Sequence, residues 1–180
     1  PRPSGRHGHV GSAIGGELWN PYKKGKGGPG GWWIIHEPEV HFVLNQEVLV
    51  PDIAGWRKTR MPEIPEDQRF TVAPDWVCEV LSPSTESKDR NLKMVVYAKF
   101  AVQTVWLVDP VKRVLEVYWL DRGQWSTPLV YSQNQNISAV PSMGGELRQR
   151  WETQGLLTQL IQLLRSERVI AAPKYTTRNE

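Results

Sequence analysis

The chain has little cysteine and no long hydrophobic run. Cys78 is the single cysteine, so an internal disulfide is excluded. Because Cys78 lies within an apolar run, we expect a buried thiol rather than a catalytic one. No stretch of about 18 apolar residues is present, so we expect no membrane span. We recognise no signal peptide either, and the expected location is the cytoplasm.

Histidine is also scarce. The chain has four histidines: His7, His9, His36 and His41. They are not spaced as zinc ligands usually are, and no cysteine pair supports a zinc site. A serine nucleophile is equally disfavoured, because Ser82 and Ser84 belong to a predicted turn and the sequence places no histidine near them. The sequence therefore predicts neither a zinc enzyme nor a serine hydrolase.

Length and composition indicate one globular domain. Of the 180 residues, 39% are hydrophobic and 23% are charged, which suits a chain with one core. Nine tryptophans are many for this length, and such residues bury large areas in cores and interfaces. We expect a flexible N-terminus over residues 1–9, one domain over 10–170 and a tail over 171–180. The net charge of +3 is compatible with a polyanionic partner.

The hydrophobic pattern predicts strands interspersed with helices. Strand-like runs cover residues 32–35, 40–44, 48–56, 76–81, 104–108, 114–120 and 125–131. Helix-like spacing covers residues 10–19, 87–100 and 155–165. A glycine-rich basic loop joins the first helix to the first strand. Pro51 interrupts the third strand-like run, which implies a bulge, a bend or an edge position.

Two acidic residues stand out because they lie in or beside apolar strands. Asp52 follows the run that ends in Pro51, and Glu79 lies within the run over 76–81. A carboxylate in such a place is costly unless it is paired, hydrogen-bonded or bound to a metal. Asp52 could instead cap a bend, and Glu79 could form a structural salt bridge with a buried lysine or arginine.

The helix after Glu79 carries three polar residues at helical spacing. Asp89, Lys93 and Tyr97 form an i, i+4, i+8 row beside an apolar stripe, which we take as the core face: Leu92, Val95, Val96 and Phe100. From this row Lys93 can approach Glu79, and Tyr97 can hydrogen-bond the lysine or a phosphate. Taken alone, Lys93 is typical of a solvated helix residue and Tyr97 of the edge of a core.

This set of groups suits metal-dependent phosphodiester hydrolysis. Mg²⁺ or Mn²⁺ prefers oxygen ligands, and Asp52, Glu79 and the backbone carbonyl of Val80 are the candidates. Such an ion polarises the phosphate and lowers the pKa of a bound water, which becomes the nucleophile. The ammonium of Lys93 would orient that water or offset charge in the transition state.

Four blocks of sequence carry a family resemblance. They are VPDIAGWR at 50–57, APDWVCEVLSPST at 73–85, the stretch from Asp89 through Lys93 to Ala98, and VWLVDP at 105–110. In order and spacing they resemble the Uma-two restriction endonuclease family, which is assigned to the PD-(D/E)XK nuclease superfamily. The likeness runs from about Gly30 to Leu120. It implies an α/β (α+β) fold with a restriction endonuclease-like core, in which helices flank a mixed β-sheet of four or five strands.

The resemblance also implies roles for individual residues. Asp52 matches the first acidic residue of the superfamily and Glu79 the second. Leu81 stands where many members carry the catalytic lysine, and Lys93 resembles the migrated lysine of other members. Glu39 could supply an auxiliary upstream acid, as could its neighbour Glu37, although a solvent-facing strand residue is the alternative for Glu39.

The predicted partner is DNA, and the predicted function is a metal-dependent endonuclease. Candidate phosphate contacts are Lys23, Lys24, Lys26, Arg57, Lys58, Arg60, Lys88 and Arg90. No segment reads as a base-recognition helix, so no sequence preference is predicted. The alternative is a nuclease-fold protein that binds nucleic acid or a protein partner without cutting. A homodimer, with the tryptophan-rich hairpin and the helix over 155–165 at its interface, is compatible with either function.

Overall fold

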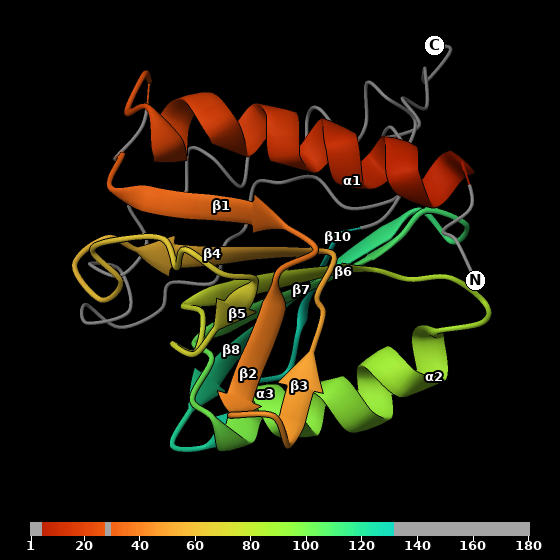
Figure 1. The fold of residues 1–180 in the computed structure, drawn as a ribbon. Helices are drawn as coiled ribbons and strands as arrows, with labels where there is room; N and C mark the ends of the chain where they lie inside the picture. Colours follow the sequence, from red (N-terminus) through yellow and green to blue (C-terminus); the bar gives the residue numbers. More distant parts are fainter. Residues whose placement is uncertain (1–4, 28–29, 132–180) are drawn as a thin grey trace, which may run out of the picture.

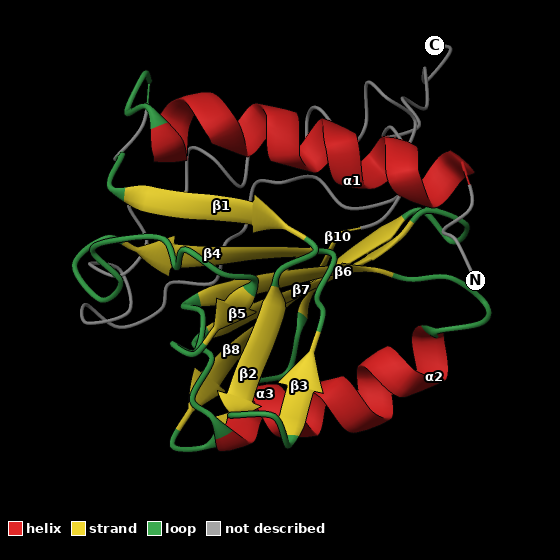
Figure 2. Ribbon diagram, in the orientation of Figure 1, coloured by secondary structure: helices red, strands yellow, loops and turns green. Residues whose placement is uncertain are grey.

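A computed structural model describes residues 5–27 and 30–131 of the chain. The described part has three layers, in which helix α1 (Gly5–Leu18) covers one face of a large sheet (Figure 1). A second helical segment covers the opposite face (Figure 2). No helix in these two ranges is both long and apolar enough to span a membrane.

The large sheet is mixed and has seven strands. Its order is β1-β4-β6-β7-β8-β10, with β9 also paired to β8. The strands are β1 (Trp32–His36), β4 (Ile53–Arg57), β6 (Trp76–Val80), β7 (Thr104–Asp109), β8 (Val114–Asp121), β9 (Gln124–Trp125) and β10 (Leu129–Tyr131). Strands β6 and β7 are parallel, and all other neighbours are antiparallel. A parallel pair needs a crossover, and here the second helical segment provides it.

This second helical segment is continuous but contains a wider turn. It consists of α2 (Glu86–Lys88), a π-helical stretch η2 (Asp89–Lys93) and α3 (Met94–Lys99). Helix α1 likewise continues into a π-helical stretch η1 (Trp19–Lys23). Single π-helical turns within helices are frequent at functional sites, which makes η2 a segment of interest.

Strand β6 is buried on both faces, as its apolar composition predicts. Cys78 and Val80 pack in the core that α1 completes with Val10 and Ile14. On the other face, Val77 belongs to a second core that also contains Met94 and Tyr97 of α3. Because side chains alternate along a strand, Glu79 faces the same side as Val77 and therefore faces α3.

A separate small sheet corrects one prediction. The run over 48–56 is not one strand: β3 (Glu47–Leu49) belongs to a three-stranded sheet with β2 (Glu39–Val43) and β5 (Arg69–Phe70), whereas β4 belongs to the large sheet. Proline has no N–H to donate to a ladder, and the chain bends here before β4 begins. The break leaves Asp52 just before β4.

Other boundaries differ from the sequence-based predictions. Helix α1 begins at Gly5 rather than Val10, and residues 125–131 form two short strands instead of one. The large sheet exceeds the predicted four or five strands because β8, β9 and β10 extend it. The helix predicted over 155–165 lies outside the described residues.

The face of the second helical segment was also predicted wrongly. Leu92 and Val95 of the predicted core stripe are exposed, whereas Asp89, Met94 and Tyr97 are buried. The polar row faces inward instead, because Lys93 and Tyr97 of that row donate hydrogen bonds to the buried acid Glu79 on β6.

Gly55 in β4 offers a test of this packing. A Cβ atom at Gly55 would lie 3.1 Å from the Trp76 ring and 3.2 Å from Ile34. We expect Gly55→Val to lower the free energy of unfolding by about 1–3 kcal/mol, because the added methyl groups overpack the core. Gly16 in α1 has open space around it, so Gly16→Ala should raise stability by about 0.5–1 kcal/mol. Urea unfolding measures the free energy of unfolding of both variants. A Gly55→Val variant as stable as the unmodified protein would contradict this packing.

Candidate metal centre

Asp52 lies at the bend before β4, beside the end of β6. The antiparallel register pairs Ile53 with Cys78, so its continuation by one residue places Asp52 opposite Glu79. Residues that face each other in this way have neighbouring side chains. Asp52 Oδ2 also accepts a hydrogen bond of 2.6 Å from the backbone N–H of Val80. Asp52 therefore stabilises the bend, and it also lies next to Glu79.

Glu79 is almost fully buried, with 1% of the residue exposed, and both of its carboxylate oxygens have partners. Lys93 Nζ donates to Oε2 over 2.8 Å, and the Tyr97 hydroxyl donates to Oε1 over 2.5 Å. Both donors come from one face of the second helical segment, one turn apart. The sequence left open whether Lys93 is solvated. In the structure its ammonium points at Glu79, and only 11% of the Lys93 side chain is exposed.

Lys93 holds a second buried acid. Its Nζ atom lies 3.0 Å from Asp89 Oδ1, and it donates a longer hydrogen bond of 3.4 Å to the Val50 carbonyl. Asp89 is 2% exposed and begins the π-helical stretch that ends at Lys93. The sequence contained a signal for Asp89, since it heads the row of Lys93 and Tyr97, but its role was not recognised.

His7 is another residue that sequence reasoning missed. Its Nε2 atom lies 3.3 Å from Asp52 Oδ2, on the α1 side of the sheet. The hydrogen bond to Asp52 is the main cause that raises the pKa of His7, and burial opposes it. No sequence signal could have found this pair, because 45 positions separate the two residues and His7 precedes the predicted start of its helix.

The cluster contains more acidic than basic side chains. Glu79 and Asp89 both pair with the single ammonium of Lys93, whereas Asp52 pairs with His7. Burial raises the pKa of Glu79 to about 7, and the charges of Asp52 and Asp89 add to this effect while Lys93 opposes it. Burial acts to lower the pKa of Lys93, but the attraction of Glu79 and Asp89 outweighs it and raises that pKa overall.

This excess of acid is what a divalent cation would balance. Mg²⁺ keeps several waters and needs only one or two protein carboxylates, and Asp52 and Glu79, with the Val80 carbonyl, remain its predicted ligands. Residues 5–27 and 30–131 contain no group of three or more histidine, cysteine or acidic side chains arranged to hold a metal.

The two upstream acids, Glu39 and Glu37, have different neighbours. Glu39 contacts His41, with 2.6 Å between Oε1 and Nε2, and 40% of its side chain is exposed. Glu37 is exposed in the turn after β1, with a positive φ of 46°, and its N–H donates to the Asp52 carbonyl. The backbone of Glu37 is thus the neighbour of Asp52, whereas the contact of Glu39 is with a histidine of its own strand.

Three of the eight predicted phosphate contacts lie at the far end of the large sheet: Arg57, Lys58 and Arg60. Arg57 ends β4, the strand that Asp52 precedes, so about 17 Å separate the two residues at roughly 3.3 Å per residue. Lys58 lies over the Trp33 ring and Arg60 pairs with Asp75, near that same far end. Arg90 forms a bidentate pair with Glu116, at 2.7 and 2.8 Å, and a third contact with Glu86. Lys88 is exposed on α2.

A mixed sheet between helices, with acids gathered where β4 begins and β6 ends, defines a restriction endonuclease-like domain. The family model described as "Uma2: Putative restriction endonuclease" matches residues 1–158. The chain belongs to this family, which confirms the predicted family and fold and supports a nuclease-like function.

One solved structure resembles the chain over most of its length. It is titled "Crystal structure of a putative nuclease belonging to DUF820" and comes from Anabaena variabilis. The TM-score is 0.64 at 22% sequence identity, and the match covers 91% of this chain and 84% of that one. The likeness at this identity is one of fold. No curated protein matches the chain.

Proposed function

We propose that the protein is a DNA endonuclease that depends on Mg²⁺ or Mn²⁺. The observation that carries the proposal is the buried carboxylate of Glu79, held by Lys93 and Tyr97 beside Asp52 in a cluster of three acids. A buried acid with a strongly raised pKa and specific charged partners is typical of functional sites. Membership in a family described as restriction endonucleases supports phosphodiester bonds of DNA as the substrate.

Each residue has a role that follows from its contacts. Asp52 and Glu79 would hold the metal with the Val80 carbonyl, and a bound divalent cation supplies Lewis acidity and lowers the pKa of a water. Tyr97 fixes the orientation of the Glu79 carboxylate through its short hydrogen bond. Lys93 keeps its charge because two acids surround it, so it can offset the charge that develops on the phosphate. Asp89 positions Lys93 from the preceding helical turn.

Plasmid nicking tests the proposal. Purified protein should convert supercoiled plasmid to nicked or linear DNA with Mg²⁺ or Mn²⁺ and not with EDTA. Glu79→Ala and Asp52→Ala should each lower the rate roughly 1,000-fold, because loss of a ligand removes several kcal/mol of electrostatic stabilisation. Exposed Glu66 provides the matched control, and Glu66→Ala should cut as the unmodified protein does.

A second candidate function has its own supporting observation. Leu81, at the position where many superfamily members carry lysine, is buried in the core and is 2% exposed. Lys93 also pairs directly with Glu79, as a purely structural salt bridge would. The chain would then be a nuclease-fold protein that binds nucleic acid or a protein partner without cutting. Binding of labelled duplex DNA with no metal-dependent cleavage would favour this second function.

The homodimer and the auxiliary role of Glu39 remain predictions. Sedimentation at two protein concentrations addresses the dimer. For Glu39, which contacts His41, the comparison is between Glu39→Gln and the unmodified protein in the nicking assay. An auxiliary metal ligand predicts a slower rate and a higher Mg²⁺ requirement, whereas a strand residue predicts neither.

A further inference from the structure

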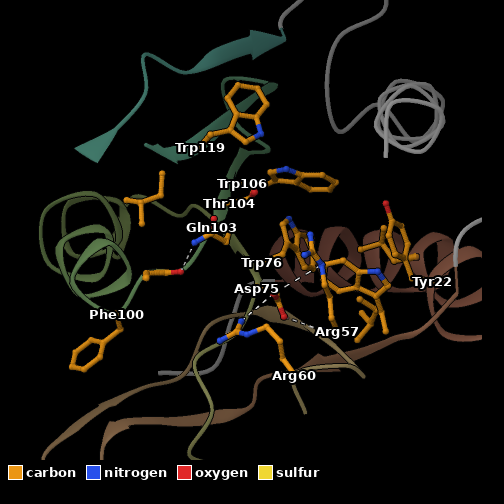
Figure 3. Close-up of a pocket in the computed structure, with 15 residues that line it drawn as sticks. Tyr22, Arg57, Arg60, Asp75, Trp76, Phe100, Gln103, Thr104, Trp106 and Trp119 are labelled. Carbon is orange, nitrogen blue, oxygen red and sulfur yellow. Dashed lines mark hydrogen bonds and ion pairs between the residues drawn. The ribbon is translucent and has the colours of Figure 1, made fainter. Parts of the chain in front are cut away.

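A second candidate site lies at the opposite end of the large sheet from the metal centre. A pocket of about 420 Å³ opens where β6 and β7 begin and β4 ends. This volume is within the usual range for sites that bind small molecules. Figure 3 shows Arg57, Arg60 and Asp75 on one side of Trp76, and Trp106 and Trp119 on another. The pocket contains none of the acids of the metal centre, so the two sites can be tested separately.

Six of the fifteen residues that line the pocket are aromatic. Besides Phe100, they come from η1, β1, β6, β7 and β8: Tyr22, Trp32, Trp76, Trp106 and Trp119. Several are fixed by edge-to-face contacts, since Tyr22 and Trp32 meet at 5.7 Å and Trp76 and Trp106 at 4.9 Å between centroids. Fixed aromatic rings offer flat surfaces to a planar ligand at little cost in side-chain entropy.

Three of these side chains carry a buried polar atom without a hydrogen-bond partner among the described residues. They are the Tyr22 hydroxyl and the indole N–H groups of Trp76 and Trp106. Indole N–H groups can only donate, so their natural partner is an acceptor atom. A buried donor that is left unpaired costs about 1–3 kcal/mol. A ligand with ring nitrogen or carbonyl acceptors would relieve that cost with a small adjustment of the rings.

The mouth of the pocket is positively charged. Arg57 and Arg60 both approach Asp75, at 4.0 and 3.0 Å, and Asp75 also accepts the Arg57 backbone N–H. One carboxylate cannot neutralise two guanidinium groups, so one positive charge remains. About half of each arginine side chain is exposed, and Arg57 lies over the Trp32 ring, 5.3 Å from its centroid. A phosphate is the group that such an arginine pair recognises best.

We propose that this pocket binds a nucleotide, with the base against the tryptophan walls and the phosphate at Arg57 and Arg60. Stacking on aromatic rings suits any base, and the donors of Trp76 and Trp106 suit the acceptor atoms of a purine. The shared chemistry is a planar base joined to a phosphate. It can be presented by a free mononucleotide or by a nucleotide at the end of a DNA strand.

Isothermal titration calorimetry of the full chain tests the proposal with dGMP, deoxyguanosine and inorganic phosphate. dGMP should bind at least tenfold more tightly than deoxyguanosine or phosphate, because only dGMP uses both the rings and the arginines. Equal binding of dGMP and phosphate, or no binding of dGMP at millimolar concentration, would overturn it. Titration with a 5′-phosphorylated oligonucleotide identifies the source: tighter binding than dGMP assigns the pocket to a strand, and weaker binding to the free nucleotide.

Variants connect the binding to the pocket. Arg60→Ala should weaken dGMP binding at least fivefold. Arg60→Lys should weaken it less, because lysine keeps the positive charge and loses only the forked donors of the guanidinium. Trp76→Phe keeps a ring and removes the N–H donor, and should also weaken dGMP. Lys112, an exposed cation near Asp109, is the control, and Lys112→Ala should bind dGMP normally. If Trp76→Phe does not fold, the test rests on the exposed residue Arg60. Unchanged affinity of Arg60→Ala for dGMP would refute the proposal.

The same titration separates this site from the metal centre. Glu79→Gln should bind dGMP as the unmodified protein does, because Glu79 does not line the pocket. A protein that fails to cut DNA can therefore still bind the nucleotide. Loss of dGMP binding in Glu79→Gln would place the ligand at the acidic cluster and would refute a separate site.

Discussion

Lys93→Met should abolish metal-dependent DNA cleavage while the protein still binds Mg²⁺. Methionine keeps the apolar stem of the side chain and removes only the ammonium, which lies 2.8 Å from Glu79 and 3.0 Å from Asp89. Loss of one aligned electrostatic group typically slows an enzyme about 100- to 1,000-fold. Plasmid nicking under single-turnover conditions measures the rate, and calorimetric titration measures Mg²⁺ affinity. We expect the affinity to stay the same or to rise, because a cation that repels the metal is gone.

Lys99 of the same helix is the matched control. It is largely exposed and pairs with Glu47 at the surface, so Lys99→Met should cut normally. Lys93→Arg provides a second variant if Lys93→Met does not fold, since it keeps the charge but changes its geometry. Normal cleavage by Lys93→Met would show that Lys93 is a structural partner of Glu79 and has no part in the reaction.

Without metal, the contribution of Glu79 to the free energy of unfolding should fall by about 3 kcal/mol as the pH rises from 4.5 to about 7.5. The cause is Glu79, whose pKa is 4.5 in an unfolded chain and about 7 when buried here. Between these values the unfolded chain has released the proton and the folded protein has kept it. Folding therefore takes up a proton at Glu79, so the stability that Glu79 contributes is fully present below pH 4.5 and is lost as the pH rises through about 7.

Urea unfolding of Glu79→Gln in EDTA isolates this effect. Glutamine has nearly the same shape and no charge to bury, so this contribution to the pH dependence should disappear. At pH 8 the variant should be more stable than the unmodified protein. Exposed Glu66 again supplies the control, and Glu66→Gln should keep the original pH profile. An unchanged slope in Glu79→Gln would mean that Glu79 is already ionised at pH 5, with Lys93 as a fully compensating partner.

The affinity for Mg²⁺ should also depend on whether the Glu79 carboxyl group carries a proton. A carboxylate must lose its proton to bind a divalent cation, so Mg²⁺ should bind about tenfold more tightly at pH 8 than at pH 6. The stability that Glu79 loses at high pH should be recovered in Mg²⁺, because a ligand of the folded state stabilises it. Thermal unfolding at the two pH values, with and without Mg²⁺, measures both effects.

Local sequence was sufficient for the central strands and for the two strand acids. The apolar run around Glu79 and the bend at Pro51 are local features, and each has a direct energetic meaning: a buried charge needs a partner, and proline cannot continue a ladder. The apolar pattern was misleading in the helix that follows β6. It favoured Leu92 and Val95 for the core, whereas the network around Glu79 turned Asp89 and Tyr97 inward instead.

The sequence by itself named Asp52, Glu79 and Lys93 as candidates, because strand periodicity and the cost of an isolated buried charge are local properties. Its resemblance to a known family implied the class of fold. Only the tertiary structure decided that Lys93 reaches Glu79 and that His7 meets Asp52. It also placed three of the predicted phosphate contacts at the far end of the sheet: Arg57, Lys58 and Arg60. These facts depend on how α1 and the helix after β6 pack on opposite faces of the sheet. No local pattern encodes that packing, because it brings together residues that are tens of positions apart in the chain.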